Sequence, residues 1–179
     1  MNQEVVKIVK ENILTRRSVR AFTEQRIGTE DLMTIAKAGV HAPTGMNRQS
    51  WTFIVLNDKK KIHELEQRIG VALSRDGNYN FYGADAVILV SNDRENGNGI
   101  ADTACAMENM FLMAHAMGID SVWINQLKDT SDDTKVRELL TEFGIPTNHI
   151  VYGVCALGYA KTEGSPKEKN EDVIRFITE

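Results

Sequence analysis

The sequence predicts one globular domain in which helices alternate with short strands. Of its 179 residues, 42% are hydrophobic and 26% charged, which suits one domain with a real core and is too short for two of ordinary size. Apolar residues recur at helical spacing in some segments and form short β-rich runs in others. Such alternation normally favours a parallel, doubly wound sheet. The phosphate-binding motifs of that class, GxGxxG after a first strand and GxxxxGKS/T, are absent from the sequence.

The first half of the chain is expected to hold three helices and one strand. Apolar residues between positions 5 and 14 predict an opening helix. A second helix, capped by Thr29, should bury one face and end before Pro43. The run WTFIVL at 51–56 is typical of a strand, and residues 58–73 return to helical spacing. The apolar positions of the second helix are Leu32, Ile35, Ala36, Gly39 and Val40.

The second half is expected to alternate strands with helices after a loop at 75–85. Strands are predicted at 86–91, 119–124 and 149–159, and helices at 100–118 and 132–144. Gly118 should close the first of these helices, which is apolar enough to be central and buried on several sides. The sequence ENGNG at 95–99 is expected to be a flexible loop. VIRFI at 173–177 alternates like a last short strand, although its own chain offers no obvious partner.

Composition argues against several classes of protein. A net charge of −4 and a pI near 5.6 argue against a general nucleic-acid binder. No apolar run approaches the about 18 residues of a membrane span, and the charged N-terminus does not resemble a signal peptide, so a cytoplasmic protein is expected. Cys105 and Cys155 lie among apolar neighbours without a CxxC spacing and should be reduced core thiols. The histidines are scattered, so no metal site is predicted.

A cluster of arginines follows the opening helix, in TRRSVRAF at 15–22. If the chain is extended there, Arg16, Ser18 and Arg20 point to one side. Guanidinium groups match the oxygens of a phosphate or carboxylate, and a serine hydroxyl adds a donor without bulk. The segment is therefore either an anion cradle or a solvated charged patch, in which exposed pairs are worth only about 0–1 kcal/mol. Spacing alone does not choose between the two.

Several stretches, taken in order, resemble the FMN-dependent nitroreductase family over nearly the whole chain. They are RRSVRAF, AGVHAPTGMNRQSWTFIVL, FYGAD before AVILVS, IADTACAMENMFLMAHAMGIDSVWI, and VCALGY with a lysine-bearing tail. The resemblance implies an α+β fold, with a mostly antiparallel central sheet flanked by helices, and a single FMN-binding domain over residues 1–179. It also implies a homodimer, in which a tail at about 165–179 crosses to the partner and VIRFI extends the partner's sheet.

The same resemblance assigns the FMN site. The arginine segment would grip the phosphate, ribityl chain and pyrimidine edge, and the tail lysines would close over the phosphate. The loop PTGMNRQSW would pack on the flavin from the neighbouring subunit, and a backbone N–H after Trp123 would point at the flavin N5 and O4. The implied cofactor-binding residues are Arg16, Arg17, Ser18, Arg20, Pro43, Thr44, Gly45, Asn47, Gln49, Ile124, Asn125, Gln126, Gly158, Lys167 and Lys169.

The sequence departs from the family pattern in two places. Asn125 and Gln126 stand where the family often carries two glycines, which leaves open whether their side chains narrow the site. Asp85 stands where proline is common, and the sequence gives no chemical account of it.

The activity implied is electron transfer from NAD(P)H through FMN to nitroaromatics, quinones or similar flat acceptors, in a ping-pong cycle. The flavin would carry the chemistry, so no catalytic side chain is predicted. Acceptors would stack on the ring near Phe81, Tyr82 or residues 107–113, although such apolar residues are more often core than substrate contacts. The alternatives are a flavin-storage protein with little turnover, favoured if Asn125 and Gln126 crowd the ring, and a specialised flavin-fragmenting or dehalogenating relative. The sequence determines neither the acceptor nor the preference between NADH and NADPH.

Overall fold

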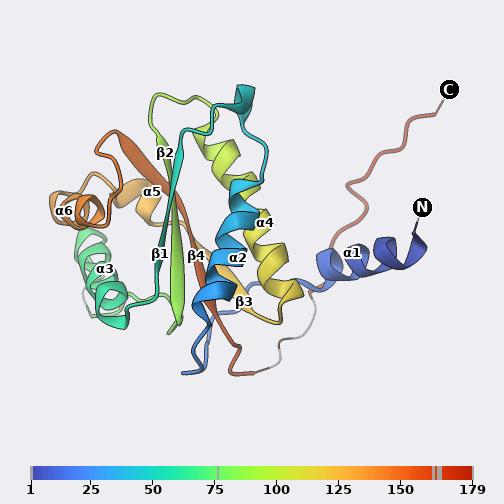
Figure 1. Cartoon of the computed structure of the whole chain (residues 1–179), viewed down its shortest axis with the longest axis horizontal. Coiled ribbons are helices and arrows are strands. Elements are labelled where there is room, and N and C mark those ends of the chain that lie inside the picture. Colours follow the sequence, from blue (N-terminus) through green and yellow to red (C-terminus); the bar gives the residue numbers. More distant parts are fainter. Residues whose placement is uncertain (1, 76, 163, 165–166, 179) are drawn as a thin grey trace.

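A computed structural model of the chain describes residues 2–75, 77–162, 164 and 167–178. Within these residues, a four-stranded sheet carries helices on both faces (Figure 1). The helices are α1 (Gln3–Thr15), α2 (Thr29–Val40), the 3₁₀ turn η1 (Gly45–Asn47), α3 (Lys59–Ala72), α4 (Gly99–Ala116), α5 (Leu127–Thr130) and α6 (Thr134–Glu142). The strands are β1 (Trp51–Leu56), β2 (Ala86–Asp93), β3 (Asp120–Ile124) and β4 (His149–Gly158).

The sheet is antiparallel throughout, with the strand order β1-β2-β4-β3. This corrects the parallel arrangement that alternation alone favoured and confirms the sheet that the resemblance implied. Leu56 at the end of β1 lies opposite Val87 at the start of β2. The chain therefore leaves the sheet after β1, runs through α3 and the following loop, and returns to the same end. The alternation of strands and helices in the sequence does not fix the end of the sheet to which the chain returns. A crossover to the opposite end would make β1 and β2 parallel.

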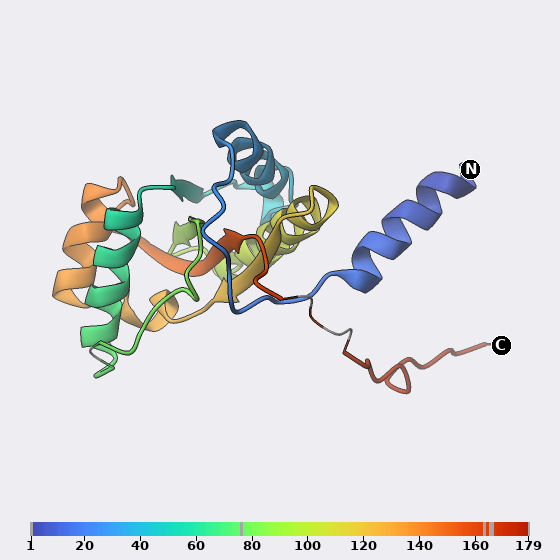
Figure 2. The same cartoon turned by 90° about the horizontal axis from the view of Figure 1, so that it is seen from below.

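Helices cover both faces of the sheet. α3, α6 and the short α5 lie on one face, and α2 and α4 lie on the other (Figure 2). Side chains of β2 alternate between the two cores: Val87 and Leu89 pack on the α3 and α6 side, whereas Ile88 and Val90 pack on the α2 and α4 side. This central position explains why the strand predicted at 86–91 is apolar on both faces.

Most helix ends follow from local sequence. The side chains of Asp58 and Asp133 cap α3 and α6, each accepting hydrogen bonds from backbone N–H groups of the first turn. Gly118 follows α4 with a φ of 72°, as predicted for a glycine that closes a helix. The prediction for α2 is wrong by one residue: Gly28 holds the N-cap position, and Thr29 is the first helical residue.

Three predictions of burial need correction. Cys155 is fully buried, and burial raises the pKa of its thiol, but Cys105 lies on an exposed side of α4. α4 buries one broad face, while Ile100 is 59% exposed. Val40, the last apolar position of α2, is also exposed. Periodicity locates the buried face of a helix, but the width of that face depends on neighbouring elements.

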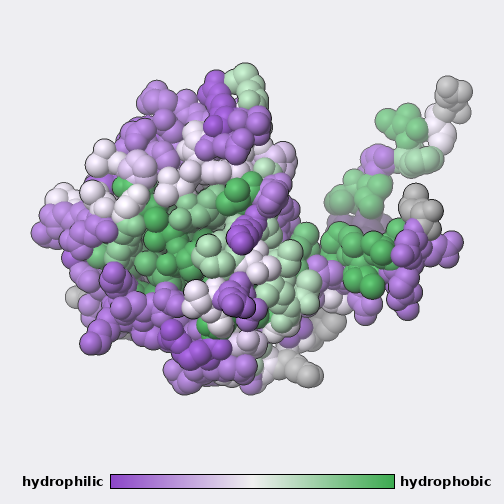
Figure 3. Space-filling view, in the orientation of Figure 1, coloured by the Kyte–Doolittle hydropathy of each residue, from purple (hydrophilic) through white to green (hydrophobic). Residues whose placement is uncertain are grey.

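Three apolar segments lack cover within the described chain. α1 and the C-terminal segment extend away from the body, beyond α4, and α1 has no buried residue (Figures 1 and 2). Among the described residues β1 pairs only with β2, and its first five residues are partly exposed. Figure 3 shows the apolar surface that results over β1, between α2 and α3. VIRFI at 173–177 forms no strand within this chain, and its apolar side chains are exposed.

Candidate cofactor site

The arginine segment runs along the outer edge of β3. Ser18 forms an isolated parallel bridge with Ser121, and the Val19 N–H donates to the Ser121 carbonyl oxygen at 3.0 Å. Val19 and Phe22 are buried, whereas Ser18 and Arg20 are exposed. The segment therefore has the extended backbone in which Ser18 and Arg20 point to one side, and this polar side faces outward.

The C-terminal segment completes a basic hollow beside this edge. The hollow has a volume of about 420 Å³. Its lining includes Arg16, Arg17, Ser18, Arg20, Thr162, Gly164, Lys167 and Lys169. Five cationic side chains in so small a space repel one another, which suits the hollow to a phosphate. The structure thus brings together the arginine segment and the tail lysines, while their role as phosphate ligands stays a prediction.

Arg17 gives the hollow an unsatisfied donor. Its Nε atom is buried and donates to no residue that the structure describes. Gly164 lies against it, because a Cβ added at this glycine would be 2.6 Å from the Arg17 Nε. A buried N–H without an acceptor costs about 1–3 kcal/mol. A phosphate or ribityl oxygen fits this donor, so the residues of the hollow fit FMN.

Arg16 is held differently from its neighbours. Its Nε lies 3.8 Å from Oε1 of Glu108, and its guanidinium carbon lies 5.7 Å from the centre of the Phe111 ring. Both partners belong to α4. A partly exposed pair of this kind contributes about 0–1 kcal/mol, so Arg16 can turn to a phosphate at little cost. Arg20 makes no ion pair with any described residue, which leaves its charge for a ligand.

The loop at 43–49 has a strained and exposed backbone. Met46, Asn47 and Gln49 have φ angles of 55°, 53° and 50°. Each such residue costs about 1–3 kcal/mol, a strain that collects at functional sites. The Gln49 N–H donates to Thr44 Oγ1 at 3.2 Å, and Gln49 Nε2 donates to Asn47 Oδ1 at 3.0 Å. The two amides that the resemblance assigned to the flavin therefore lie together on an exposed turn.

This loop does not reach the basic hollow of its own chain. The Gly45 N–H donates to Oδ1 of Asp102, in the first turns of α4, at 2.9 Å. The described lining of the hollow comes from the end of α1, the arginine segment and the C-terminal segment, and includes no residue of 43–49. Arg16, in this lining, lies beside Glu108 in a later turn of α4. Two groups of residues assigned to one flavin thus lie at different places along α4.

The third group of assigned residues lies where β3 ends. Ile124 is buried, Asn125 is exposed, and the Tyr79 hydroxyl donates to Gln126 Oε1 at 3.3 Å. Burial, followed by the charge of Glu66, raises the pKa of Tyr79, so its hydroxyl remains a donor. Neither backbone N–H of residues 125 and 126 donates to a described residue. Both N–H groups are therefore available to a ligand, and the Gln126 side chain is tied to Tyr79.

Gly158 has a structural reason to be glycine. It lies buried at the end of β4, and a Cβ there would be 2.7 Å from two ring carbons of Phe22. The Phe22 ring therefore occupies the space that a side chain would need. Gly158 thus packs against Phe22, two residues after Arg20, and its role in binding the cofactor stays a prediction.

Residues expected to contact an acceptor are mostly core. Phe81, Met107 and Met110 are fully buried, which agrees with the expectation that these apolar positions are core and not acceptor contacts. Their side chains fill the two cores between the sheet and its helices. Tyr82 is 38% exposed and stays a candidate.

Asp85, which the sequence left unexplained, ties three segments together. Its side chain is fully buried, and its Oδ2 accepts a hydrogen bond from the Ile27 N–H at 2.8 Å. Its Oδ1 lies 3.3 Å from Nη1 of Arg26 and 3.4 Å from Nζ of Lys59. Two cations and an N–H offset the cost of burying the carboxylate. Asp85 thus fixes the approach to α2 beside the starts of β2 and α3.

A buried polar network behind the 43–49 loop is not evident from the sequence. ENGNG, expected to be flexible, forms a turn in which Asn96 is buried and donates to both Ser50 and Asp102. Asn98, in the same turn, packs against Gly45, where a Cβ would be 2.3 Å from Asn98 Nδ2. The network joins three separate segments, so only the density of Ser, Asn and Asp in each could have signalled it.

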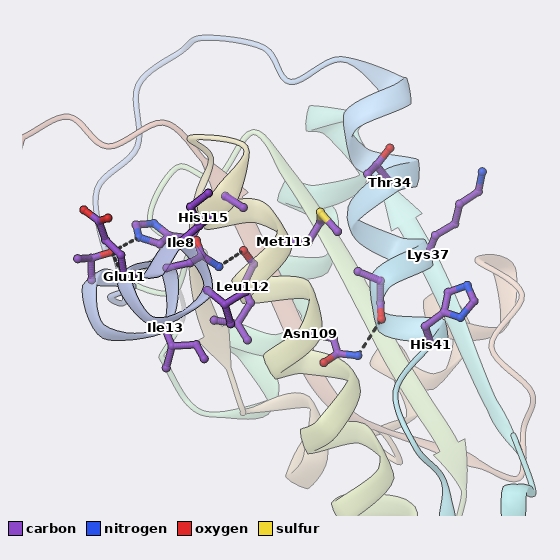
Figure 4. A pocket seen from close by; sticks show the side chains of 15 residues that line it. Ile8, Glu11, Ile13, Thr34, Lys37, His41, Asn109, Leu112, Met113 and His115 are labelled. Carbon is purple, nitrogen blue, oxygen red and sulfur yellow. Dashed lines mark hydrogen bonds between the residues drawn. The ribbon is translucent and has the colours of Figure 1, made fainter. Parts of the chain in front are cut away.

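A larger hollow, of about 910 Å³, lies between α1, α2 and α4 (Figure 4). Lys37 of α2 and His41, which caps its C-terminal end, lie across from Asn109 of α4. Apolar side chains of α1 such as Ile8 and Ile13 form another wall. Its described lining residues include one lysine, Lys37, and no arginine. Exposed apolar side chains of α1 form part of its wall, so the smaller basic hollow is the better candidate for an anionic cofactor.

Other kinds of site find no support in the described part of the chain. No three His, Cys, Asp or Glu side chains there are grouped as a metal site requires. None of its helices is both long enough and apolar enough to cross a bilayer.

Comparison with known proteins identifies the family. The model of the nitroreductase family matches residues 13–159. The chain belongs to this family. It is 33% identical over 156 residues to an Archaeoglobus fulgidus protein named for NADH dehydrogenase/NAD(P)H nitroreductase activity, and the match covers 84% of each chain.

Solved structures of nitroreductases share the fold. One from Bacteroides fragilis, crystallised with bound FMN, has a TM-score of 0.89 at 38% identity and covers 95% of this chain and 98% of its own. One from Desulfitobacterium hafniense, also with bound FMN, has a TM-score of 0.84 at 26% identity and covers 96% and 98%. The α+β architecture implied by the resemblance is therefore confirmed, whereas exchange of the C-terminal strand stays a prediction.

Proposed function

We propose that this nitroreductase-family protein is an FMN-dependent oxidoreductase that takes electrons from NAD(P)H and passes them, in a ping-pong cycle, to nitroaromatic, quinone or similar flat acceptors. The observation that carries the proposal is the basic hollow, where three arginines and two lysines from distant segments gather beside β3. The FMN bound in the two similar structures supports FMN as the anion that this hollow receives. The name of the Archaeoglobus relative supports a nicotinamide donor.

Each group of residues has a task in this proposal. Arg17, Arg20 and the tail lysines hold the phosphate and ribityl chain through charge-assisted hydrogen bonds, each worth about 1.5–3 kcal/mol. FMN, when bound, supplies the redox-active ring. The N–H groups of Asn125 and Gln126 donate to the ring edge and stabilise negative charge there. No side chain is given an acid–base or covalent role.

We infer that the protein works as a homodimer with each flavin between two chains. The 43–49 loop and the basic hollow lie apart within one chain, so one flavin can contact both only if the loop comes from the partner. The open edge of β1 and the exposed segment 173–177 complement each other, because a strand added from the partner would cover both. Residues 1–179 then form one cytoplasmic domain whose tail, about 165–179, crosses to the partner.

The visible spectrum of the purified protein tests the proposed activity. We expect a yellow protein with one FMN per chain, whose flavin absorption is bleached by NADH or NADPH without oxygen and restored by a quinone or nitroaromatic. Parallel double-reciprocal lines are expected in the steady state. A protein that cannot be loaded with FMN would refute the proposal. Full loading with no bleaching by either nucleotide would instead indicate a storage protein.

Mixing two defective variants tests the shared site. Arg20→Ala weakens the hollow, and Gly45→Ala disturbs the loop, because its Cβ would be 2.3 Å from Asn98 Nδ2. If the loop acts across a symmetric dimer, random reassociation of the two variants should restore about one flavin site in four. A site built within one chain would recover none, since every chain in the mixture carries a defect.

A further inference from the structure

The 43–49 loop is clamped at both ends while its middle is exposed. At one end, the Gly45 N–H donates to Oδ1 of Asp102 at 2.9 Å. At the other end, Ser50 Oγ donates to Asn92 Oδ1 at 2.8 Å and accepts from Asn96 Nδ2 at 3.1 Å. Between the clamps, residues 46–49 are exposed, and three of them have positive φ angles. The shape of this exposed turn is therefore fixed by buried residues behind it.

Asp102 and Asn96 join the two clamps. The Oδ2 of Asp102 accepts a hydrogen bond from Asn96 Nδ2 at 3.0 Å, and Asn96 Nδ2 also faces Ser50. Asn96 is itself held, because its Oδ1 accepts from the Asn98 N–H at 3.0 Å. A displacement of Asp102 would thus disturb the hydrogen bonds at both ends of the loop.

The burial of Asp102 is unusual for its charge. The residue is only 4% exposed and forms no ion pair with a described residue. Its two carboxylate oxygens are instead satisfied by the Gly45 N–H and the Asn96 amide. Buried carboxylates normally require a cation or several hydrogen bonds. The position in the first turns of α4 lowers this cost, because a helix N-terminus favours negative charge.

We propose that Asp102 is a positioning residue that holds the 43–49 loop in the shape in which its Asn47 and Gln49 amides receive the flavin of the partner subunit. This inference rests on the proposed function. Asp102 touches neither the flavin nor the acceptor, and it acts through the Gly45 N–H and through Asn96. Because the loop faces the ring and ribityl chain, the loss should be the same for FMN and for riboflavin, whereas loss of a phosphate ligand weakens FMN alone.

Asp102→Asn is the sharpest test, because it changes one atom. Whichever way the new amide turns, an NH₂ group faces a donor, either the Gly45 N–H or Asn96 Nδ2. We expect about tenfold weaker binding of both FMN and riboflavin, faster hydrogen exchange at residues 44–50 in the flavin-free protein, and an altered visible circular dichroism of bound flavin. Asp133→Asn is the matched control, because Asp133 caps α6 far from the loop and asparagine caps helices equally well.

A reciprocal exchange separates positioning from general stability. In the double variant Asp102→Asn with Asn96→Asp, the new carboxylate can accept from the new amide, whose oxygen can still accept from the Gly45 N–H. Ser50 Oγ loses the Asn96 donor and must itself donate to the new carboxylate, so one hydrogen bond of the second clamp is not recovered. We expect flavin affinity, exchange rates and circular dichroism to return part of the way to wild type. If Asp102→Asn fails to fold, Ser50→Ala breaks the other clamp and should weaken both flavins to a smaller extent.

The outcomes distinguish the inference from the function beneath it. If the wild type binds flavin, and Asp102→Asn changes neither flavin binding nor hydrogen exchange at residues 44–50, the inference is overturned while the proposed function stands. A loss in Asp102→Asn that affects FMN but not riboflavin, or that the reciprocal exchange leaves wholly unrestored, would also overturn it. Failure of the wild type to bind FMN would overturn the proposed function, and the flavin role of Asp102 with it.

Discussion

Replacement of Gly158 by alanine should destabilise the protein by overpacking Phe22. The added Cβ would be 2.7 Å from Cδ1 and Cγ of Phe22 and 2.8 Å from its Cβ, and this ring is only 1% exposed. The contact involves the root of the side chain, so rotation of the ring cannot relieve it. Overpacking of this kind costs about 1–3 kcal/mol. For a domain of this size, the melting temperature should fall by roughly 2–4 °C for each kcal/mol.

Thermal unfolding of the flavin-free protein measures this loss without any contribution from cofactor binding. Gly97→Ala is the matched control, because a Cβ there has no atom within 4 Å and the backbone does not have a positive φ. We expect the control to melt near the wild-type temperature. Gly158→Ala should cost less in a Phe22→Ala background than in the wild type, because the Cγ and Cδ1 atoms that the new Cβ would meet are absent, and a double-mutant cycle measures this coupling. An unchanged melting temperature in Gly158→Ala, with weaker FMN binding, would refute the packing argument and place Gly158 at the cofactor.

Three further results are expected. Arg20→Ala should weaken FMN by about tenfold or more and riboflavin far less, in a fluorescence titration, because a charge-assisted hydrogen bond to phosphate is worth about 1.5–3 kcal/mol; equal losses would place Arg20 on the ring. Deletion of residues 172–179 should give a less stable, flavin-poor protein by calorimetry and absorption, and an intact, fully loaded dimer would contradict strand exchange. Burial lowers the pKa of His149, so below about pH 6.5 the unfolded state binds more protons than the folded state. The free energy of unfolding should therefore fall as pH drops below that value and level off below the pKa of His149 in the folded protein. His149→Gln should flatten this slope in urea titrations, and an unchanged slope would assign it to other groups.

Local sequence determined most of the secondary structure. The Asp58 and Asp133 caps, the glycine that closes α4 and the apolar runs of the strands all act within a few residues, so they can be read directly. The ordered motifs also gave the family, which the match over residues 13–159 confirms. Periodicity failed on strand direction, because the path of the chain between β1 and β2 is set by packing and not by spacing.

Tertiary structure decided what the individual residues do. The sequence showed three arginines, but only the fold pairs Arg16 with Glu108 and leaves Arg20 without an ion pair among the described residues. The sequence showed a glycine at 158 and an unexplained acid at 85, and their partners lie more than 20 positions away along the chain. Asp102 and Asn96, separated from Ser50 by some 50 positions, came together only through the packing of α4 against the loop. Side-chain partners distant in sequence leave no periodic signal, so their chemistry exists only once the chain has folded.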